Sequence, residues 1–240
     1  MKAVILAAGI GKRLWAVTEQ RPKCLIELGG EALLVRHLDA LASVGIKQAV
    51  IVVGYKAEMI RAAIGSDCCG VEVRYLTNPQ YQRGNIMSQW LARAELDDDI
   101  LIMDADVLFH RKVLRRLVES SWPTALLLDE TVSQKAEECM AIVGGGRVVA
   151  LSKRIPDRYD FAGEGVGFLK VKRADTGPLL HSLQMHVDRS ELDMEYEDAL
   201  QEFFGSVRVG YEKIGGLPWI EIDFPEDLER AERQVLPKLD

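Results

Sequence analysis

The N-terminal segment constrains the fold of this 240-residue chain more than any other feature. Residues 2–6 form a short apolar run, Lys2-Ala3-Val4-Ile5-Leu6, which is typical of a buried parallel strand. Gly9 and Gly11 follow it, and glycine leaves the backbone N–H groups of a turn open to close approach by phosphate. Arg13 and Lys23 would supply the positive charge that bound phosphates require. The segment therefore predicts a strand followed by a phosphate-binding turn.

Two common glycine motifs do not fit this spacing. A dinucleotide fingerprint requires a third glycine three residues beyond Gly11, where the chain has Leu14. A P-loop requires its first glycine at the position of Leu6, and a Ser or Thr after Lys12, where the chain has Arg13. The remaining alternative is an ordinary strand–turn–helix connection with incidental glycines, which leaves the basic residues without a role.

The run Leu6-Ala7-Ala8-Gly9-Ile10-Gly11-Lys12-Arg13-Leu14, followed by Arg21-Pro22-Lys23, resembles the signature of the sugar-phosphate and phosphocholine nucleotidyltransferases. Weaker similarity extends over nearly the whole chain, at Gly54-Tyr55, Asn78-Pro79, Asn85 with Ser88, Asp104-Ala105-Asp106, Ser152-Lys153, Gly163-Glu164, Tyr196-Glu197 and Glu221-Ile222-Asp223. These later matches look like the phosphocholine, inositol-phosphate and aminoethylphosphonate cytidylyltransferases. The segment Trp15-Ala16-Val17-Thr18 departs from the usual first motif, in which a proline precedes a Leu-Thr pair.

Composition sets the size and the class of the protein. With 48% apolar residues the chain can bury one sizeable core, so we expect a single domain over residues 1–240. A formal net charge of −7 argues against a nucleic-acid-binding surface. The N-terminal apolar run is too short for a signal peptide or a membrane helix, so we expect no membrane partner and a cytoplasmic location. A homodimer stays an open alternative.

The pattern of apolar runs predicts an α/β fold. Strands are expected at residues 2–8, 48–53, 71–75, 99–103 and 124–128, with helices between most of them. Leu34, Leu38 and Leu41 form one such helical stripe. Right-handed crossovers would build a Rossmann-like, mostly parallel, doubly wound sheet flanked by helices, which is also the fold that the resemblance implies. Further strands near 147–151 and 164–171 predict a small antiparallel excursion for the acceptor, followed by helices near 175–186 and 195–204.

Asp104 and Asp106 follow the strand Ile100-Leu101-Ile102-Met103. In open α/β sheets ligands bind beyond the carboxyl ends of the strands, and Mg²⁺ is usually held by one or two carboxylates plus substrate phosphates. The resemblance implies that Asp106 and Asp223 hold Mg²⁺. The alternative is structural, with Asp106 capping a turn and Asp223 capping the helix that is expected to start near Pro225.

The resemblance also implies a substrate pair, CTP and a small phosphorylated or phosphonate metabolite, and a set of contacts. Arg13, Lys23 and Lys153 would be catalytic, the first two at the nucleotide phosphates and Lys153 at the acceptor's phosphate. The nucleotide-binding residues would be Leu6, Ala7, Ala8, Gly9, Gly11, Gly54, Tyr55, Asn85, Ser88 and Asp104. Asn85 and Ser88 have a second interpretation as residues at a helix N-terminus, with Asn85 as its cap.

The acceptor-binding residues would be Lys153, Arg154, Glu164, Tyr196 and Glu197, and three acceptor types stay open. A choline group calls for an aromatic cage, for which Tyr159, Phe161, Trp219 and Tyr196 are available. An aminoalkyl group calls for carboxylates, for which Glu138, Glu164 and Glu197 are available. An additional anion calls for arginines such as Arg83, Arg154 and Arg158.

Two other functions remain as alternatives. One is a hexose-1-phosphate nucleotidylyltransferase that uses UTP or dTTP. The other is a non-catalytic nucleotide-binding regulator. The joint presence of Arg13, Lys23, Asp106, Lys153 and Asp223 argues against the regulator, since binding alone does not need a full set of charges around the reacting phosphorus.

Overall fold

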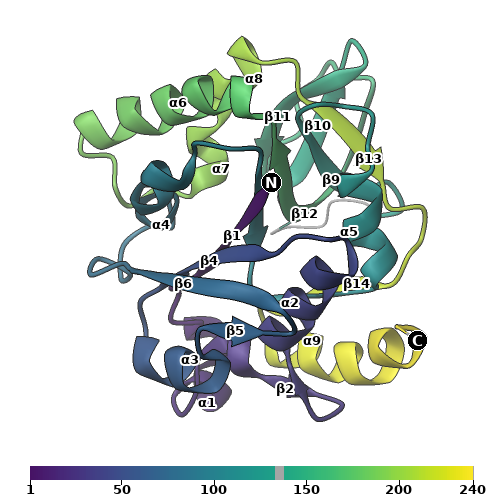
Figure 1. Cartoon of the computed structure of the whole chain (residues 1–240). Coiled ribbons are helices and arrows are strands. Elements are labelled where there is room, and N and C mark those ends of the chain that lie inside the picture. Colours follow the sequence, from purple (N-terminus) through teal and green to yellow (C-terminus); the bar gives the residue numbers. More distant parts are fainter. Residues whose placement is uncertain (133–137, 240) are drawn as a thin grey trace.

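The computed structural model describes residues 1–132 and 138–239 and combines one large mixed sheet with helices on both of its faces (Figure 1). The strands are β1 (Lys2–Ala7), β2 (Glu27–Leu28), β3 (Glu31–Ala32), β4 (Gln48–Val53), β5 (Asp67–Cys68), β6 (Val71–Thr77), β7 (Ile100–Asp104), β8 (Val107–Phe109), β9 (Ala125–Asp129), β10 (Met140–Gly144), β11 (Arg147–Ser152), β12 (Phe161–Val171), β13 (Gly210–Lys213) and β14 (Trp219–Glu221). The α-helices are α1 (Trp15–Thr18), α2 (Leu33–Ser43), α3 (Ala57–Ile64), α4 (Ile86–Leu91), α5 (Arg111–Val118), α6 (Thr176–Asp188), α7 (Tyr196–Ala199), α8 (Gln201–Ser206) and α9 (Pro225–Arg230).

The strand order explains where the site forms. Along the main path it is β11-β10-β12-β7-β1-β4-β6-β5, and β7, β1, β4 and β6 run parallel to their neighbours within this group. Leu6 of β1 pairs with Asp104 of β7, so the predicted glycine turn and the predicted acidic pair leave the sheet at the same edge.

The second half of the sheet is largely antiparallel. Strand β12 pairs antiparallel with β7, β9 and β10, and β11 extends the sheet beyond β10. The predicted antiparallel excursion is therefore present, and its strands continue the central sheet. The predicted helix at 195–204 is divided into α7 and α8 on either side of Leu200.

Alternation along the strands buries both faces of the sheet. On β1, Ala3, Ile5 and Ala7 pack into one core with α2, α3 and α5, whereas Val4 faces a second core with α4, α6, α7 and α8. Leu34, Leu38 and Leu41 on α2 are fully buried, as their spacing predicts. A smaller third cluster joins Leu14 and Ile222 to the C-terminal helical segment through Ala231 and Val235.

Strands β8 and β14 form a separate antiparallel pair that places the C-terminal segment beside the acidic loop. Val107 pairs with Glu221, and the Ile222 backbone N–H donates to the Asp106 carbonyl at 3.0 Å. A contact between residues more than a hundred positions apart thus brings Asp223 to Asp106. Within the described residues, no helix combines the length and the apolarity needed to span a bilayer.

Candidate functional site

A cavity of about 640 Å³ opens at the carboxyl ends of β1 and β7. This volume is in the range of sites for small molecules. Thirteen of the predicted residues line it: Leu6, Ala7, Gly9, Gly11, Arg13, Lys23, Asn85, Asp104, Asp106, Lys153, Arg154, Glu197 and Asp223. Residues that sequence reasoning did not assign also line it, including Lys12, Tyr81, Gln82, Glu195, Asp198 and Glu221.

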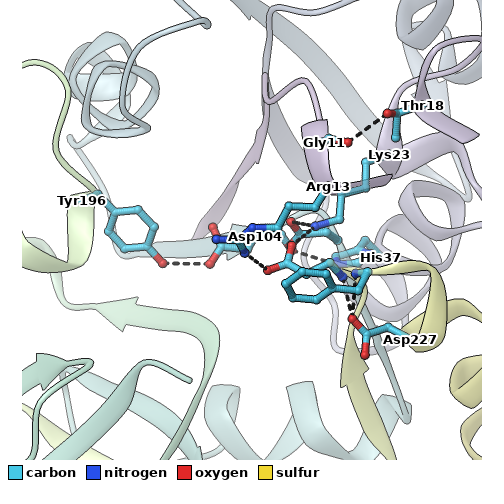
Figure 2. A network of polar contacts seen from close by, with 11 residues as sticks. Gly11, Arg13, Thr18, Lys23, His37, Asp104, Tyr196 and Asp227 are labelled. Carbon is cyan, nitrogen blue, oxygen red and sulfur yellow. Dashed lines mark hydrogen bonds and ion pairs between the residues drawn. The ribbon is translucent and has the colours of Figure 1, made fainter. Parts of the chain in front are cut away.

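The glycine turn is fixed from behind by Thr18. Gly11 has a left-handed backbone with φ of +67°, and an added Cβ would meet Thr18 Cγ2 at 3.0 Å. The buried Thr18 hydroxyl donates to the carbonyl of Gly11 at 2.9 Å (Figure 2). A Cβ on Gly9 would meet no protein atom within 4 Å, so this glycine leaves room on the cavity side. The turn therefore has the open backbone that a phosphate cradle requires.

Gly54 and Tyr55 support the turn from outside the large cavity. The Tyr55 backbone N–H donates to the Ala8 carbonyl at 3.0 Å, and a Cβ on Gly54 would lie 2.5 Å from Tyr81 Cβ. The Tyr55 ring lines a second, neighbouring cavity, and Ala8 is buried. Gly54, Tyr55 and Ala8 therefore lie beside the turn and outside the lining of the large cavity, and their nucleotide contacts stay a prediction.

Lys23 and Arg13 join the glycine turn to the acidic residues. Lys23 Nζ lies 2.8 Å from Asp106 Oδ2 and 2.5 Å from Asp223 Oδ1, while Arg13 Nη1 lies 3.0 Å from Asp223 Oδ2. Burial alone would lower the pKa of Lys23, but the two carboxylates outweigh burial and hold the pKa above its usual value. Burial alone would raise the pKa of Asp223, and Lys23 and Arg13 reverse that effect and lower it.

Asp106, Glu221 and Asp223 form a candidate cation site. Each offers one carboxylate oxygen, and these oxygens all lie within 4.8 Å of one another. One carboxylate oxygen of Asp106, Oδ1, is buried and has no hydrogen-bond partner within the described chain. A set of close carboxylate oxygens with an unsatisfied member fits Mg²⁺, which takes oxygen ligands. Desolvation, together with the Asp106 and Asp223 carboxylates, raises the pKa of Glu221 to about 8, as expected for acids that crowd one site.

The structure also decides the capping alternative for Asp223. Asp227 Oδ2 accepts from the backbone N–H of Phe224 at 2.8 Å and of Asp223 at 3.1 Å, so Asp227 satisfies the start of α9. The side chain of Asp223 points instead to Lys23 and Arg13. The helix therefore does not account for this carboxylate.

Asp104 lines the cavity beside the candidate cation site. Its Oδ2 accepts from the hydroxyl of the buried Tyr196 at 2.9 Å (Figure 2). Burial, with the Glu197 and Asp106 carboxylates, raises the pKa of Asp104 well above its usual range. On the opposite side, the ring nitrogens of the buried His37 lie 2.8 Å and 3.1 Å from the carbonyl oxygens of Leu33 and Asp104. His37 thereby ties α2 to the end of β7.

Asn85 connects the start of α4 to the start of α7. Its Oδ1 accepts from the Tyr196 backbone N–H at 2.6 Å, and its side chain also hydrogen-bonds to Glu197. Asn85 is the N-cap residue of α4, as its second interpretation predicts, but its side chain makes no capping hydrogen bond to that helix. Ser88 is buried and accepts from Asn78 Nδ2 at 3.1 Å, away from the cavity lining. Its predicted nucleotide contact is corrected accordingly, because the helix turns its hydroxyl inward.

The segment before α4 and the segment before α7 make further contacts beside Asn85. Arg83 forms a bidentate ion pair with Asp193, at 2.8 Å and 2.7 Å. The backbone N–H of Gly84 donates to the Leu192 carbonyl at 3.1 Å. A Cβ on Gly84 would lie only 2.1 Å from the Met194 carbonyl oxygen, so the close approach requires glycine.

The part of the cavity between the end of β11 and the start of α7 carries charges of both signs. Lys153 and Arg154 line it together with Glu195, Glu197 and Asp198. Glu164 does not line it, because β12 directs it toward Glu138 and Asp129, and burial with these carboxylates raises the pKa of Glu164 to about 7. The predicted acceptor contacts of Glu164 and Tyr196 are thus corrected, since Tyr196 lies behind Asp104 and does not face the cavity.

Two relatives match nearly the whole length of this chain. A CMP-5'-(3-aminopropyl)phosphonate synthase from Streptomyces rubellomurinus is 30% identical over 99% of this chain, and the chain spans 39% of the length of that relative. A UTP–glucose-1-phosphate uridylyltransferase from Haloferax volcanii is 27% identical over 98% of this chain and 96% of the relative.

Solved structures have the same fold. The inositol-1-phosphate CTP transferase from T. maritima superimposes with a TM-score of 0.78 at 24% identity, covering 99% of this chain and 95% of that one. This likeness confirms the predicted α/β nucleotidyltransferase fold. Residues 3–142, which contain the glycine turn, Lys23 and the acidic pair, match the MobA-like NTP transferase domain. The predicted resemblance to nucleotidyltransferases is therefore confirmed, and the chain belongs to the family of MobA-like NTP transferase domains.

Proposed function

We propose that the protein is a Mg²⁺-dependent cytidylyltransferase, which transfers CMP from CTP to a small metabolite bearing a phosphate or phosphonate group. One observation carries the proposal. A single cavity brings together the open glycine turn, the cations Arg13 and Lys23, and the carboxylates of Asp106 and Asp223. These are the groups needed to bind a triphosphate and to neutralise charge at its α-phosphorus.

The proposed reaction needs no general base. An ionised oxygen of the acceptor's phosphate or phosphonate attacks the α-phosphorus of CTP and forms a new P–O bond. The bond from the α-phosphorus to the oxygen that bridges to the β-phosphorus breaks, and its electron pair leaves with pyrophosphate. Because the nucleophile is already ionised at neutral pH, positioning and charge neutralisation provide the catalysis.

The residues divide this work by position. Arg13 and Lys23 would neutralise the nucleotide phosphates and the departing pyrophosphate, since both line the cavity beside the glycine turn. Lys153 would bind the acceptor's phosphate or phosphonate group from the part of the cavity between the end of β11 and the start of α7. Asp106, Glu221 and Asp223 would hold Mg²⁺, which when bound supplies positive charge to phosphate oxygens.

The choice of CTP is supported by the Streptomyces relative, whose name specifies a CMP product, and by the sequence features shared with cytidylyltransferases. The alternative is uridylyl transfer to a sugar 1-phosphate. That alternative is favoured by the Haloferax relative, which the chain covers over nearly its whole length.

The test is pyrophosphate release with Mg²⁺ over a grid of CTP, UTP, dTTP, ATP and GTP against small phosphonates, phosphate monoesters and glucose 1-phosphate. The proposal predicts release with CTP and a phosphonate or phosphate monoester. Release confined to UTP or dTTP with glucose 1-phosphate would replace it by the sugar-nucleotide alternative. Nucleotide binding without any release would reject transferase activity toward these acceptor classes.

A further inference from the structure

Arg13 lines the cavity and forms an ion pair with Asp223 that holds it only weakly. Its Nη1 lies 3.0 Å from Asp223 Oδ2, and the Arg13 and Asp223 side chains are 47% and 33% exposed. An ion pair with this much exposure contributes little, because water competes for both charges and a long side chain loses conformational freedom in the pair. Asp223 also contacts Lys23 and is a proposed ligand of Mg²⁺, so its negative charge is shared. Asp223 alone therefore does not account for the orientation of the Arg13 guanidinium.

The ring of Phe224 makes a second contact with Arg13. The Arg13 Cζ atom lies over this ring, 5.2 Å from the ring centroid. This is within the distance of about 6 Å at which the negative face of an aromatic ring attracts a guanidinium. Arg13 and Asp223 line the cavity, whereas Phe224 is not among the residues that line it. The ring therefore contacts Arg13 from outside the cavity lining.

Burial does not explain the position of the Phe224 ring. Phe224 is 39% exposed, and it belongs to none of the three buried clusters of the described chain. Ile222, two residues earlier, is fully buried in the third cluster. Because hydrophobic stabilisation is roughly proportional to the apolar area removed from water, a phenylalanine this exposed gains little from packing. The contact with Arg13 is therefore the feature of the described structure that accounts for this ring.

The backbone holds Phe224 in place. Asp227 Oδ2 accepts from the backbone N–H of Phe224 at 2.8 Å and of Asp223 at 3.1 Å. Phe224 has an extended backbone, with φ of −122° and ψ of 161°, which suits a residue that precedes proline. Pro225 then starts α9. A fixed segment thus presents the ring to Arg13, whose side chain has several rotatable bonds.

We propose that Phe224 is a positioning residue, and that the face of its ring holds the Arg13 guanidinium where it meets the nucleotide phosphates. This inference rests on the proposed function. An aromatic face attracts the charge of a guanidinium without supplying an oxygen acceptor, so it does not compete with phosphate oxygens for the N–H donors of Arg13. A further carboxylate in the same place would compete for these donors and would repel the phosphates. The ring therefore orients Arg13 and leaves its donors available to the nucleotide.

Three substitutions separate this role from simple packing. Phe224→Leu keeps an apolar side chain but removes the aromatic face, and Phe224→Tyr keeps that face. Arg13→Ala removes the group through which the ring is proposed to act. If Phe224 acts through Arg13, the effect of Phe224→Leu on nucleotide binding disappears when Arg13 is already alanine, which a double-mutant cycle measures.

The experiment is isothermal titration calorimetry with CTP and Mg²⁺ in the absence of any acceptor. Phe224→Leu should raise the Kd for CTP by about 2- to 5-fold, the value of an exposed cation–π contact. Phe224→Tyr should bind CTP as tightly as the wild type. Arg13→Ala should raise the Kd by about tenfold or more, because charge-assisted hydrogen bonds to phosphate are lost. Adding Phe224→Leu to Arg13→Ala should cause no further loss.

Tyr75→Leu is the matched control. Arg61 Cζ lies over the Tyr75 ring at 4.8 Å from its centroid, and neither residue lines the cavity. Removal of this second arginine–aromatic contact should leave the Kd for CTP at the wild-type value. Melting followed by circular dichroism shows that each variant is folded, and Phe224→Leu should melt within about 2 °C of the wild type because its ring is exposed.

The outcomes separate this inference from the function on which it rests. Wild-type affinity in Phe224→Leu, an equal loss in Phe224→Tyr, or an equal effect of Phe224→Leu with and without Arg13 would overturn the inference alone. A wild-type protein that binds UTP but not CTP would contradict cytidylyl transfer, and the same variants titrated with UTP would still decide the role of Phe224. Binding of neither nucleotide would overturn both.

Discussion

Replacing Lys23 with Met should destabilise the protein and make its stability depend on Mg²⁺. The Lys23 side chain is 12% exposed and its ammonium contacts Asp106 and Asp223, at 2.8 Å and 2.5 Å. Without it, Asp106 loses the partner of Oδ2 while Oδ1 already has none in the described residues. Asp223 would keep Arg13.

The magnitude follows from these contacts. Hydrogen bonds to charged groups contribute about 1.5–3 kcal/mol each. Because the Asp106 and Asp223 side chains are 26% and 33% exposed, water compensates part of the loss. We therefore expect a loss of about 2 kcal/mol in the free energy of unfolding. For a chain of this length that corresponds to roughly 4–8 °C in Tm.

The assay is thermal unfolding followed by circular dichroism, with and without Mg²⁺. A divalent cation can replace the missing positive charge, so Mg²⁺ should stabilise Lys23→Met more than the wild type. At ten times its dissociation constant it would return about 1.4 kcal/mol. Lys172→Met is the matched control, since Lys172 is 52% exposed and contacts Asp99 at 3.2 Å. It should cost less than about 1 kcal/mol and show no added response to Mg²⁺. Melting of Lys23→Met within about 1 °C of the wild type, or equal stabilisation of both proteins by Mg²⁺, would refute the reasoning.

Four further predictions separate chemistry from folding. Asp106→Asn should lower kcat by roughly 100-fold or more, and a wild-type rate in Mg²⁺ would remove Asp106 from the mechanism. Gly9→Ala should leave Tm unaltered, because the new Cβ meets no protein atom within 4 Å. It should nevertheless raise KM for CTP, and melting data together with steady-state kinetics would test both results. Gly84→Ala should lower stability by about 1–3 kcal/mol, measured by urea unfolding, because its Cβ would lie 2.1 Å from the Met194 carbonyl oxygen. Burial and the Asp106 and Asp223 carboxylates raise the pKa of Glu221 to about 8, so the affinity for Mg²⁺, measured by calorimetry, should increase from pH 6 to pH 8 as Glu221 ionises, and an affinity that does not change would contradict its role as a ligand.

The parts of the fold that local sequence specifies were predictable. A pattern of a few residues was enough to predict burial of the apolar run of β1 and of the α2 stripe formed by Leu34, Leu38 and Leu41. The glycine turn was equally readable, since Gly11 occupies a left-handed conformation that other residues rarely adopt. The predicted mostly parallel sheet holds for its first half, where each strand pairs with a neighbour through a crossover.

The parts of the site that depend on distant pairing were not predictable in the same way. Glu221 lies beside Asp106 because β14 pairs antiparallel with β8, and no local sequence pattern predicts that pairing. A signal was present, since Glu221 and Asp223 are two residues apart and an extended chain directs such residues to one side. Ser88 and Glu164 failed as site residues for the converse reason, because the direction of a side chain depends on the phase of its helix or strand.

The most direct measurement is ³¹P NMR of the reaction of CTP, Mg²⁺ and 2-aminoethylphosphonate with the enzyme. The account predicts that the acceptor's phosphonate resonance is replaced by two coupled signals from a phosphonate joined to CMP, together with an equal amount of free pyrophosphate. If the acceptor signal persists under conditions in which the protein joins UMP to glucose 1-phosphate, the proposal of cytidylyl transfer to a phosphonate is contradicted.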